Sequence, residues 1–189
     1  MTAEIIEESI SVLPQYENIP IAFRVLSRFR IEPSEHGLGG WNLMEEEVEP
    51  YIKDYDAIKG ESPSEWPKRW DISNWGVLSA FVDKRRIGGV VIAWKTEGLN
   101  MLMFREDSCV IWDLRVHPDL RRSGIGNELF ARAVDWARGR GCSQLMVETQ
   151  DINVPACRFY ARQGCELAAV DRQAYKDLDE VQLIWQKAI

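Results

Sequence analysis

The sequence "DLRVHPDLRRSGIGNELF" spans Asp113 to Phe130 and decides the fold class. Apolar and polar residues alternate up to His117, as is typical of a β-strand. Two arginines and two glycines follow Pro118, and from Ile125 onward the apolar residues recur at helical spacing. The first turn of a helix presents unpaired backbone N–H groups and the positive end of the helix dipole. A glycine-rich junction beside arginines therefore predicts a phosphate-binding site.

The rest of the chain predicts a mixed α/β fold with a central sheet. Residues 1–18 are expected to form a short arm or one helix, and residues 95–107 a connection. Within residues 33–75 we expect a short strand near 40–44, with or without a helical turn after it, and then a long irregular segment. Strands are predicted at 19–31, 75–83, 86–94, 108–117 and 143–150 and in two closing segments, and helices at 123–141 and 153–164.

Three known phosphate-binding loops were compared with the strand-to-helix junction. The P-loop pattern GxxxxGK[ST] does not occur, and the dinucleotide pattern GxGxxG lacks its third glycine after Gly126. "RRSGIG" (121–126) matches [QR]-x-x-G-x-[GA], the pyrophosphate loop of the GCN5-related N-acetyltransferases (GNATs). "VETQDINVPACRFY" (147–160) resembles the second cofactor segment of that family, most closely in its streptothricin acetyltransferase branch. The resemblance covers roughly residues 75–189.

The resemblance implies the GNAT fold, an α/β fold with a single domain over residues 1–189. Its central sheet is mixed, mostly antiparallel and twisted, splayed between the fourth and fifth strands and flanked by helices. Residues 1–75 would then hold an N-terminal strand and a variable acceptor-side region, and residues 76–189 the acetyl-coenzyme A-binding core.

The resemblance further implies acetyl-coenzyme A as acetyl donor and a primary amine as acceptor, joined by direct attack in a ternary complex. The side chain of Asn153 would hold a pantetheine amide, although asparagine is also a good helix N-cap. Cys157 would pack against the cofactor. The backbone of the remaining predicted cofactor residues would bind the pantetheine arm (Leu114, Arg115, Val116) and the pyrophosphate (Arg121, Arg122, Ser123, Gly124, Ile125, Gly126, Asn127).

Tyr160 and Glu148 are the predicted catalytic residues. Tyr160 lies two helical turns after Asn153, hence on the same helix face, and a phenol is protonated at pH 7 and can donate to the leaving thiolate. A structural tyrosine is the alternative. Glu148 would act as base or contact the substrate ammonium, and Asp113 competes for that role. A nucleophilic Cys157 is disfavoured, because neither histidine lies near it in the sequence.

Trp41, Tyr51, Trp75 and Asp113 are the predicted acceptor contacts, because aromatic rings and carboxylates suit a cationic amine. The acceptor is predicted to be a small molecule: a streptothricin-like or aminoglycoside-like antibiotic, which would confer antibiotic resistance, or a polyamine. Two alternatives stay open, an acetyltransferase of protein N-termini or lysines and a non-catalytic module that senses acetyl-coenzyme A.

Composition narrows the partners and the compartment. The formal net charge of −7 argues against nucleic acid, which requires a basic surface. Four cysteines without a CxxC pair and two histidines predict neither a metal site nor disulfides, but reduced and mostly buried thiols. The N-terminus does not resemble a signal peptide, and no apolar run approaches the roughly 20 residues of a membrane helix, so we expect a cytoplasmic protein without a membrane partner. Members of the family often dimerise, and the sequence leaves a homodimer open.

Overall fold

The structure is a computed structural model that describes residues 3–102 and 105–189. The chain forms two compact units, each built from segments that lie apart in the sequence. The prediction of one domain, divided near residue 75, stays a prediction. Unit 1 comprises Met1–Ala22, Asp54–Val147 and Gln186–Ile189, and unit 2 comprises Phe23–Lys53 and Glu148–Trp185.

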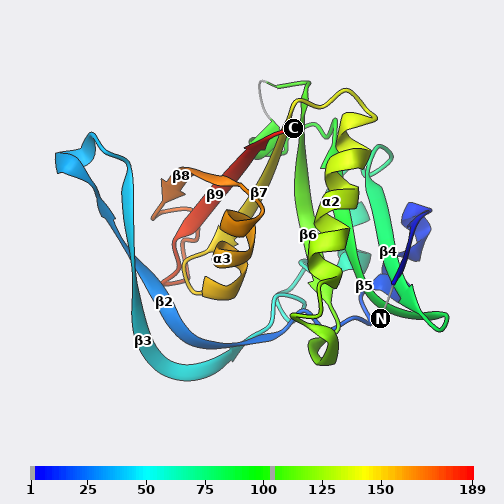
Figure 1. Ribbon diagram of the computed structural model, residues 1–189, viewed down its shortest axis with the longest axis horizontal. Helices are drawn as coiled ribbons and strands as arrows, with labels where there is room; N and C mark the ends of the chain where they lie inside the picture. The colour runs from blue at the N-terminus through cyan, green and yellow to red at the C-terminus, as the bar shows by residue number, and fades with distance from the viewer. Residues whose placement is uncertain (1–2, 103–104) are drawn as a thin grey trace. The chain divides into compact units, whose positions relative to one another are not determined.

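The described residues form a seven-stranded sheet with the strand order β1-β4-β5-β6-β7-β9-β8 (Figure 1). The pairs β1–β4, β4–β5 and β5–β6 are antiparallel, whereas β6–β7 is parallel and is connected through α2 (Ile125–Arg138). This confirms the predicted mixed, mostly antiparallel sheet. The strands are β1 (Glu4–Glu8), β4 (Gly76–Val82), β5 (Arg85–Trp94), β6 (Ser108–Val116), β7 (Gln144–Gln150), β8 (Glu166–Asp171) and β9 (Gln182–Ala188).

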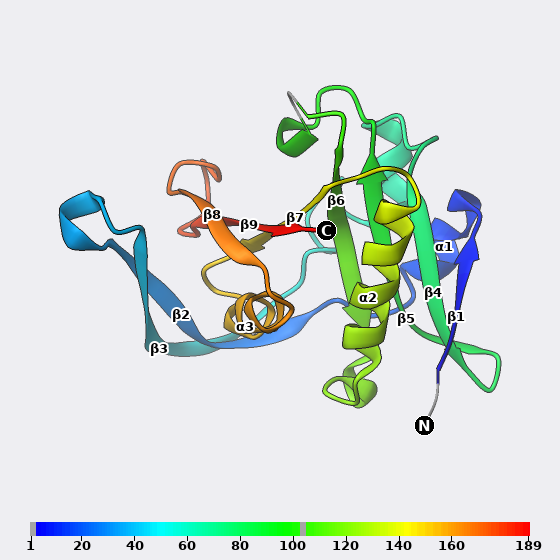
Figure 2. The same cartoon turned by 45° about the horizontal axis from the view of Figure 1, so that its top comes forward.

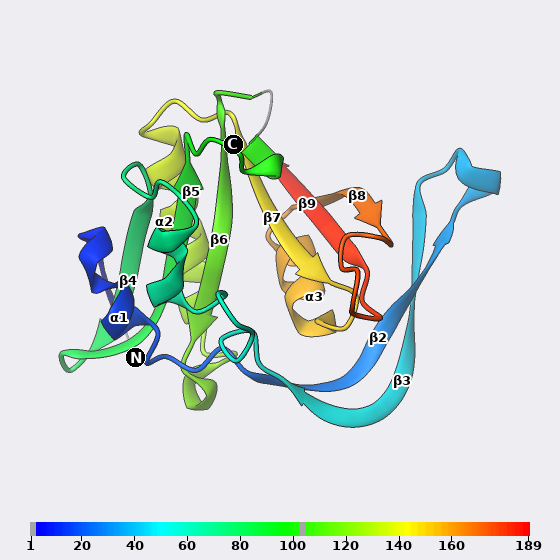
Figure 3. The same cartoon turned by 180° about the vertical axis from the view of Figure 1, so that it is seen from behind.

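Two adjacent glycines let a helix approach each face of the sheet in unit 1. α2 covers one face of β4, β5 and β6, and α1 (Leu13–Tyr16) lies on the opposite face (Figures 2 and 3). A Cβ on Gly88 would lie 3.3 Å from Leu129 of α2, and a Cβ on Gly89 would lie 2.5 Å from the Tyr16 ring. Successive strand residues face opposite sides of the sheet. Gly88 therefore allows the close approach of α2 on one face, and Gly89 allows that of α1 on the other.

Four tryptophans form a cluster in unit 1. The rings of Trp66, Trp70 and Trp75 pack around Trp112 of β6, with centroids 5.3 to 6.3 Å apart. The indole N–H of Trp75 donates a hydrogen bond of 2.7 Å to the Thr96 hydroxyl. Such pairs each contribute about 0.5–1.5 kcal/mol beyond the burial of their area. The tryptophans therefore order the irregular end of the segment 33–75 by packing it against the sheet.

Two predictions for the N-terminal part of the chain were wrong. Residues 1–18 contain the strand β1, which pairs with β4 from Glu4↔Phe81 to Glu8↔Val77. The acidic sequence of β1 hides this strand, because an edge strand obtains its order from backbone pairing and from the Glu8–Arg86 ion pair. The short strand near 40–44 is in fact β3, Trp41–Lys53, thirteen residues long. Its glutamates are exposed and suit a strand that pairs with a single partner.

In unit 2, β2 (Phe23–Pro33) and β3 form an antiparallel two-stranded sheet, with a register shift between Val25 and Ser27. The helix α3 (Val154–Arg162) begins after Asn153, whose side chain accepts a hydrogen bond from the Ala156 N–H at 3.2 Å. The short 3-10 helices of the chain are η1 (Ile10–Val12), η2 (Glu35–Gly37), η3 (Pro63–Lys68), η4 (Asn100–Leu102) and η5 (Pro118–Leu120).

The strands predicted at 75–83 and 86–94 and the helices predicted at 123–141 and 153–164 are confirmed as β4, β5, α2 and α3, with ends shifted by a few residues. Residues 103–104 of the predicted connection lie outside the described residues. All four cysteines are buried thiols, as predicted. Among the described residues, no helix has the length and apolar character needed to cross a membrane.

Candidate active site

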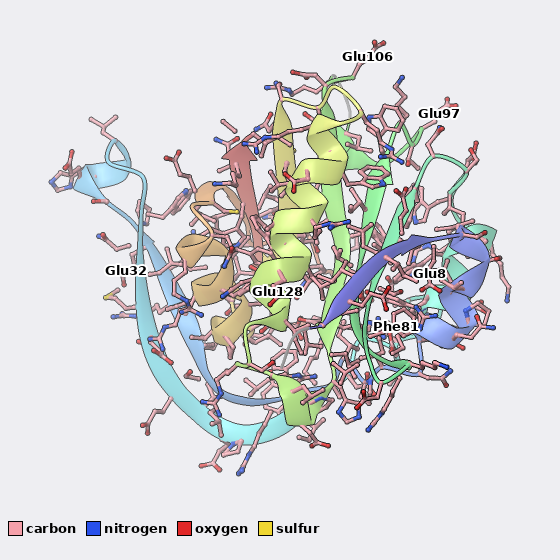
Figure 4. The ribbon with its side chains drawn as sticks, turned by 45° about the vertical axis from the view of Figure 1, so that its right-hand side comes forward. Glu8, Glu32, Phe81, Glu97, Glu106 and Glu128 are labelled. Carbon is pink, nitrogen blue, oxygen red and sulfur yellow. The ribbon has the colours of Figure 1, made fainter. Side chains whose placement is uncertain are left out.

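The loop before α2 in unit 1 has the geometry of an anion cradle. Gly124 has a φ of +97°, a left-handed conformation that favours glycine, and an added Cβ would meet no atom within 4 Å. The first helical hydrogen bond runs from the Asn127 N–H to the Gly124 carbonyl at 2.9 Å. The N–H groups just before it have no carbonyl one turn back, so they can donate to a ligand. Glu128 lies exposed on α2 (Figure 4), where a carboxylate suits the helix dipole. The loop therefore fits a pyrophosphate.

The two arginines of "RRSGIG" differ in their surroundings. Arg121 donates through Nε to the Val116 carbonyl at 3.1 Å and through Nη2 to the Pro20 and Ala22 carbonyls at 3.1 and 3.0 Å. Arg121 is an exposed residue, but partial burial of its charged group lowers its pKa. Its side chain thus connects the loop to the end of β6 and to residues 20–22, which leaves its backbone for the predicted phosphate contact. Arg122 is exposed and has a φ of +64°.

The pantetheine prediction concerns the backbone of the last residues of β6. On one side they pair with β5, at Val90↔Leu114, Gly89↔Arg115 and Gly88↔Val116. The parallel pairing with β7 ends at Ile111↔Val147, although β6 continues to Val116. β6 and β7 correspond to the fourth and fifth strands, which were predicted to splay apart. Their pairing stops part-way along β6.

Asp113 and Arg115 are alternate residues of β6 and form a buried ion pair in unit 1. Arg115 donates to the two Asp113 oxygens at 2.9 and 2.6 Å, and also to Asp56 at 2.7 Å. The Tyr16 hydroxyl donates to Asp113 at 2.5 Å. Burial and the Asp113 charge raise the pKa of Tyr16, which keeps its hydroxyl a donor. The Asp113 carboxylate is thus engaged by a cation and a phenol.

Glu148 lies on β7 in unit 2, half-buried, and accepts hydrogen bonds from neutral groups. The Tyr175 hydroxyl donates to Oε1. Gln182 donates to Oε2 at 2.7 Å. The amide of Gln150 donates to Oε1 at 3.3 Å and to the Tyr175 oxygen at 2.7 Å. These contacts orient the carboxylate plane from both of its oxygens.

The residues predicted on α3 lie together in unit 2. Asn153 caps the helix, so the capping alternative is seen directly, and its pantetheine contact stays a prediction. Cys157 lies with its sulfur 3.3 Å from the Thr149 hydroxyl, and burial raises its pKa to about 11. It is therefore a neutral thiol near pH 7, which is unsuitable for a nucleophile. Tyr160 is buried, with its ring centroid 5.1 Å from that of Phe159.

The predicted aromatic acceptor contacts are not brought together by any one unit. Trp75 belongs to the buried tryptophan cluster of unit 1. Trp41 and Tyr51 are both exposed residues of β3 in unit 2, but they lie near opposite ends of the pairing with β2. The Arg172 guanidinium lies 6.0 Å from the Trp41 ring. Partial burial and the Glu180 carboxylate raise the pKa of Tyr51.

A comparison with known protein families covers the loop before α2 and the segment from β7 to α3. The sequence model of the Acetyltransferase (GNAT) family matches residues 41–165. This chain belongs to the GNAT family. It is accordingly an N-acetyltransferase, and acetyl-coenzyme A is its co-substrate.

Three relatives of this GNAT protein carry streptothricin in their names. Streptothricin acetyltransferase A of Bacillus subtilis (strain 168) is 38% identical over 79 residues, which span 40% of this chain and 46% of that protein. The streptothricin acetyltransferase of Escherichia coli is 28% identical over 183 residues, 96% of this chain and 90% of that protein. A Bacillus anthracis str. Ames structure described as a streptothricin acetyltransferase in complex with acetyl coenzyme A has a TM-score of 0.78 at 25% identity, and covers all of both chains.

Sequence analysis of this acetyltransferase did not predict the polar side chains that contact Glu148, nor the partners of Asp151. Tyr175 and Gln182 contact Glu148, but they lie in a loop and a closing strand without any motif. Asp151 follows "ETQ" directly and is fully buried, and it accepts hydrogen bonds of 2.7 Å from Arg28 and from the Val181 N–H. A buried aspartate needs such partners, but no local pattern in the sequence shows which they are.

Proposed function

We propose that this acetyltransferase transfers the acetyl group of acetyl-coenzyme A to a primary amine of a streptothricin-class antibiotic. The observation that carries the proposal is the similarity to the Escherichia coli streptothricin acetyltransferase over 96% of this chain and 90% of that protein. Acetylation removes the positive charge of the amine, so the proposed role is antibiotic resistance by chemical modification.

The donor half of the reaction is assigned to unit 1. The N–H groups at the start of α2 and the left-handed Gly124 would bind the pyrophosphate. The backbone of Leu114 to Val116 would bind the pantetheine arm and polarise the thioester carbonyl. The family resemblance further implies a contact from the side chain of Asn153 to a pantetheine amide.

The acceptor half is assigned to unit 2. Glu148 would attract the substrate ammonium and take up the proton that the amine loses. The amine nitrogen then attacks the thioester carbon, a C–N bond forms, and the C–S bond breaks. Tyr160 would donate its phenolic proton to the departing thiolate, and the acylated nitrogen would return a proton to the Tyr160 oxygen as the neutral amide forms. Asp113 is already paired with Arg115, so we assign the ammonium to Glu148.

The test is coenzyme A release from acetyl-coenzyme A across a panel of amines: streptothricin, an aminoglycoside, a polyamine and a peptide. We expect turnover with streptothricin, which Tyr160→Phe reduces while acetyl-coenzyme A still binds. Turnover of the peptide alone would replace the proposal by the protein acetyltransferase alternative. Tight binding of acetyl-coenzyme A without turnover of any amine would favour the sensing module.

A further inference from the structure

The loop between β8 and β9, residues 172–181, brings a phenol to the carboxylate that sequence analysis singled out. We propose that Tyr175 is a positioning residue, which holds Glu148 in the orientation that receives the acceptor ammonium. This inference rests on the proposed function and assigns to the β8–β9 loop a part in choosing the acceptor. The variable acceptor-side region predicted within residues 1–75 does not include this loop.

The contacts on the two Glu148 oxygens explain why a single hydroxyl matters. Tyr175 donates to Oε1 and Gln182 donates to Oε2 at 2.7 Å, so the carboxylate plane is held from both ends. The Gln150 amide also donates to the Tyr175 oxygen, at 2.7 Å. Without the phenol, one oxygen would keep only the longer Gln150 contact of 3.3 Å among these three.

The charge of these donors suits a cationic acceptor. A phenol near neutral pH and two amides carry no net charge. These three donors orient the Glu148 carboxylate and add no positive charge of their own, whereas an arginine lies beside Asp113. A carboxylate in a fixed orientation attracts an ammonium group and lines it up for attack.

The loop itself is anchored, so the Tyr175 ring is held in place. At its start the Arg172 guanidinium donates to the Ile31 carbonyl at 2.5 Å. At its end Arg28 binds Asp179 at 2.7 Å, and Lys53 binds Glu180 in a mostly buried ion pair. These anchors connect the loop to β2 and β3, all within unit 2. The position of the phenol is therefore set by structure on both sides of the loop.

A double-mutant cycle tests the inference. We expect Tyr175→Phe to lower kcat/KM for the acceptor amine by about 10-fold or more, because hydrogen bonds to charged groups are worth about 1.5–3 kcal/mol and 1.4 kcal/mol corresponds to a factor of ten. In a Glu148→Gln background the same substitution should change kcat/KM by less than about 2-fold, because its effect passes through the carboxylate. The KM for acetyl-coenzyme A should stay within about 2-fold in Tyr175→Phe.

The matched control is Leu178→Ala in the same loop, where the side chain is exposed and neutral. It should leave kcat/KM within about 2-fold. Equal effects of Tyr175→Phe with and without Glu148 would overturn the inference, as would wild-type kinetics in Tyr175→Phe. Whatever the outcome for Tyr175, turnover of streptothricin by the wild-type protein supports the proposed function. If the wild type acetylates another amine instead, the proposed substrate fails, and the cycle with that amine still decides the role of Tyr175.

Discussion

Asp113 and Glu148 are two strand carboxylates that compete for one role in the sequence, and their surroundings differ. In unit 1, Asp113 is buried against the Arg115 guanidinium. In unit 2, Glu148 is half-buried and receives a phenol and two amides. A carboxylate paired with arginine has its charge balanced within the protein, whereas neutral donors fix the orientation of a carboxylate and add no positive charge of their own. The comparison teaches that the partners of a carboxylate, more than its position on a strand, indicate whether its role is structural or catalytic.

The largest expected effect is structural and concerns unit 1. Arg115→Met would leave two carboxylates, Asp113 and Asp56, without their cation. Breaking a buried ion pair on one side costs about 3–5 kcal/mol, which we expect as a loss in the free energy of unfolding measured by urea titration. The control is Arg122→Met, an exposed arginine, with an expected change within about 0.5 kcal/mol. Equal stabilities of the two variants would break the comparison.

The next effect is catalytic and concerns unit 2. Glu148→Gln keeps the shape and removes the charge, so we expect kcat/KM for the amine to fall by about 100-fold or more while the melting temperature stays near that of the wild type. The matched variant Asp113→Asn should show the reverse, a clear loss of melting temperature with a smaller change in kcat/KM per folded molecule. If Asp113→Asn lowered kcat/KM more than Glu148→Gln, the catalytic role would belong to Asp113 and the structural role to Glu148.

A third prediction separates the donor and acceptor halves. Gly124→Asp places a negative side chain in the open space of the loop and forces a left-handed φ on a non-glycine residue. We expect calorimetry to show at least a 100-fold loss in acetyl-coenzyme A affinity, because the carboxylate repels the pyrophosphate. Gly124→Ala measures the backbone strain alone and should lose less. Normal affinity in Gly124→Asp would remove the loop from the site.

The smallest expected effect concerns the buried thiol of Cys157 in unit 2. Since burial raises its pKa to about 11, the thiol is protonated at pH 8 and becomes a thiolate only as the pH approaches that value. We expect iodoacetamide at pH 8 to leave Cys157 unmodified in the folded protein by mass spectrometry, and activity to persist. Rapid modification with loss of activity would favour a cysteine nucleophile over Glu148 and Tyr160.

Prediction from the sequence worked best where the pattern is local. The helix at Ile125–Arg138, its glycine junction and the α3 cap at Asn153 follow from residues within a few positions of each other. β1 and the length of β3 were missed, because both strands are acidic and their order comes from pairing with distant segments. Trp75 packs against Trp112, a partner that no spacing along the chain indicates, and its predicted acceptor contact stays a prediction.

The sequence by itself determined the family of this acetyltransferase and its donor, and it predicted the residues that would hold the pyrophosphate. Those features depend on short motifs, because a helix N-terminus and a left-handed glycine are properties of adjacent residues. Only the tertiary structure decided the partners of each carboxylate. Arg115 meets Asp56 and Glu148 meets Tyr175 across long stretches of chain. Such contacts form when strands and loops pack, so their physical cause lies in the fold rather than in any local pattern.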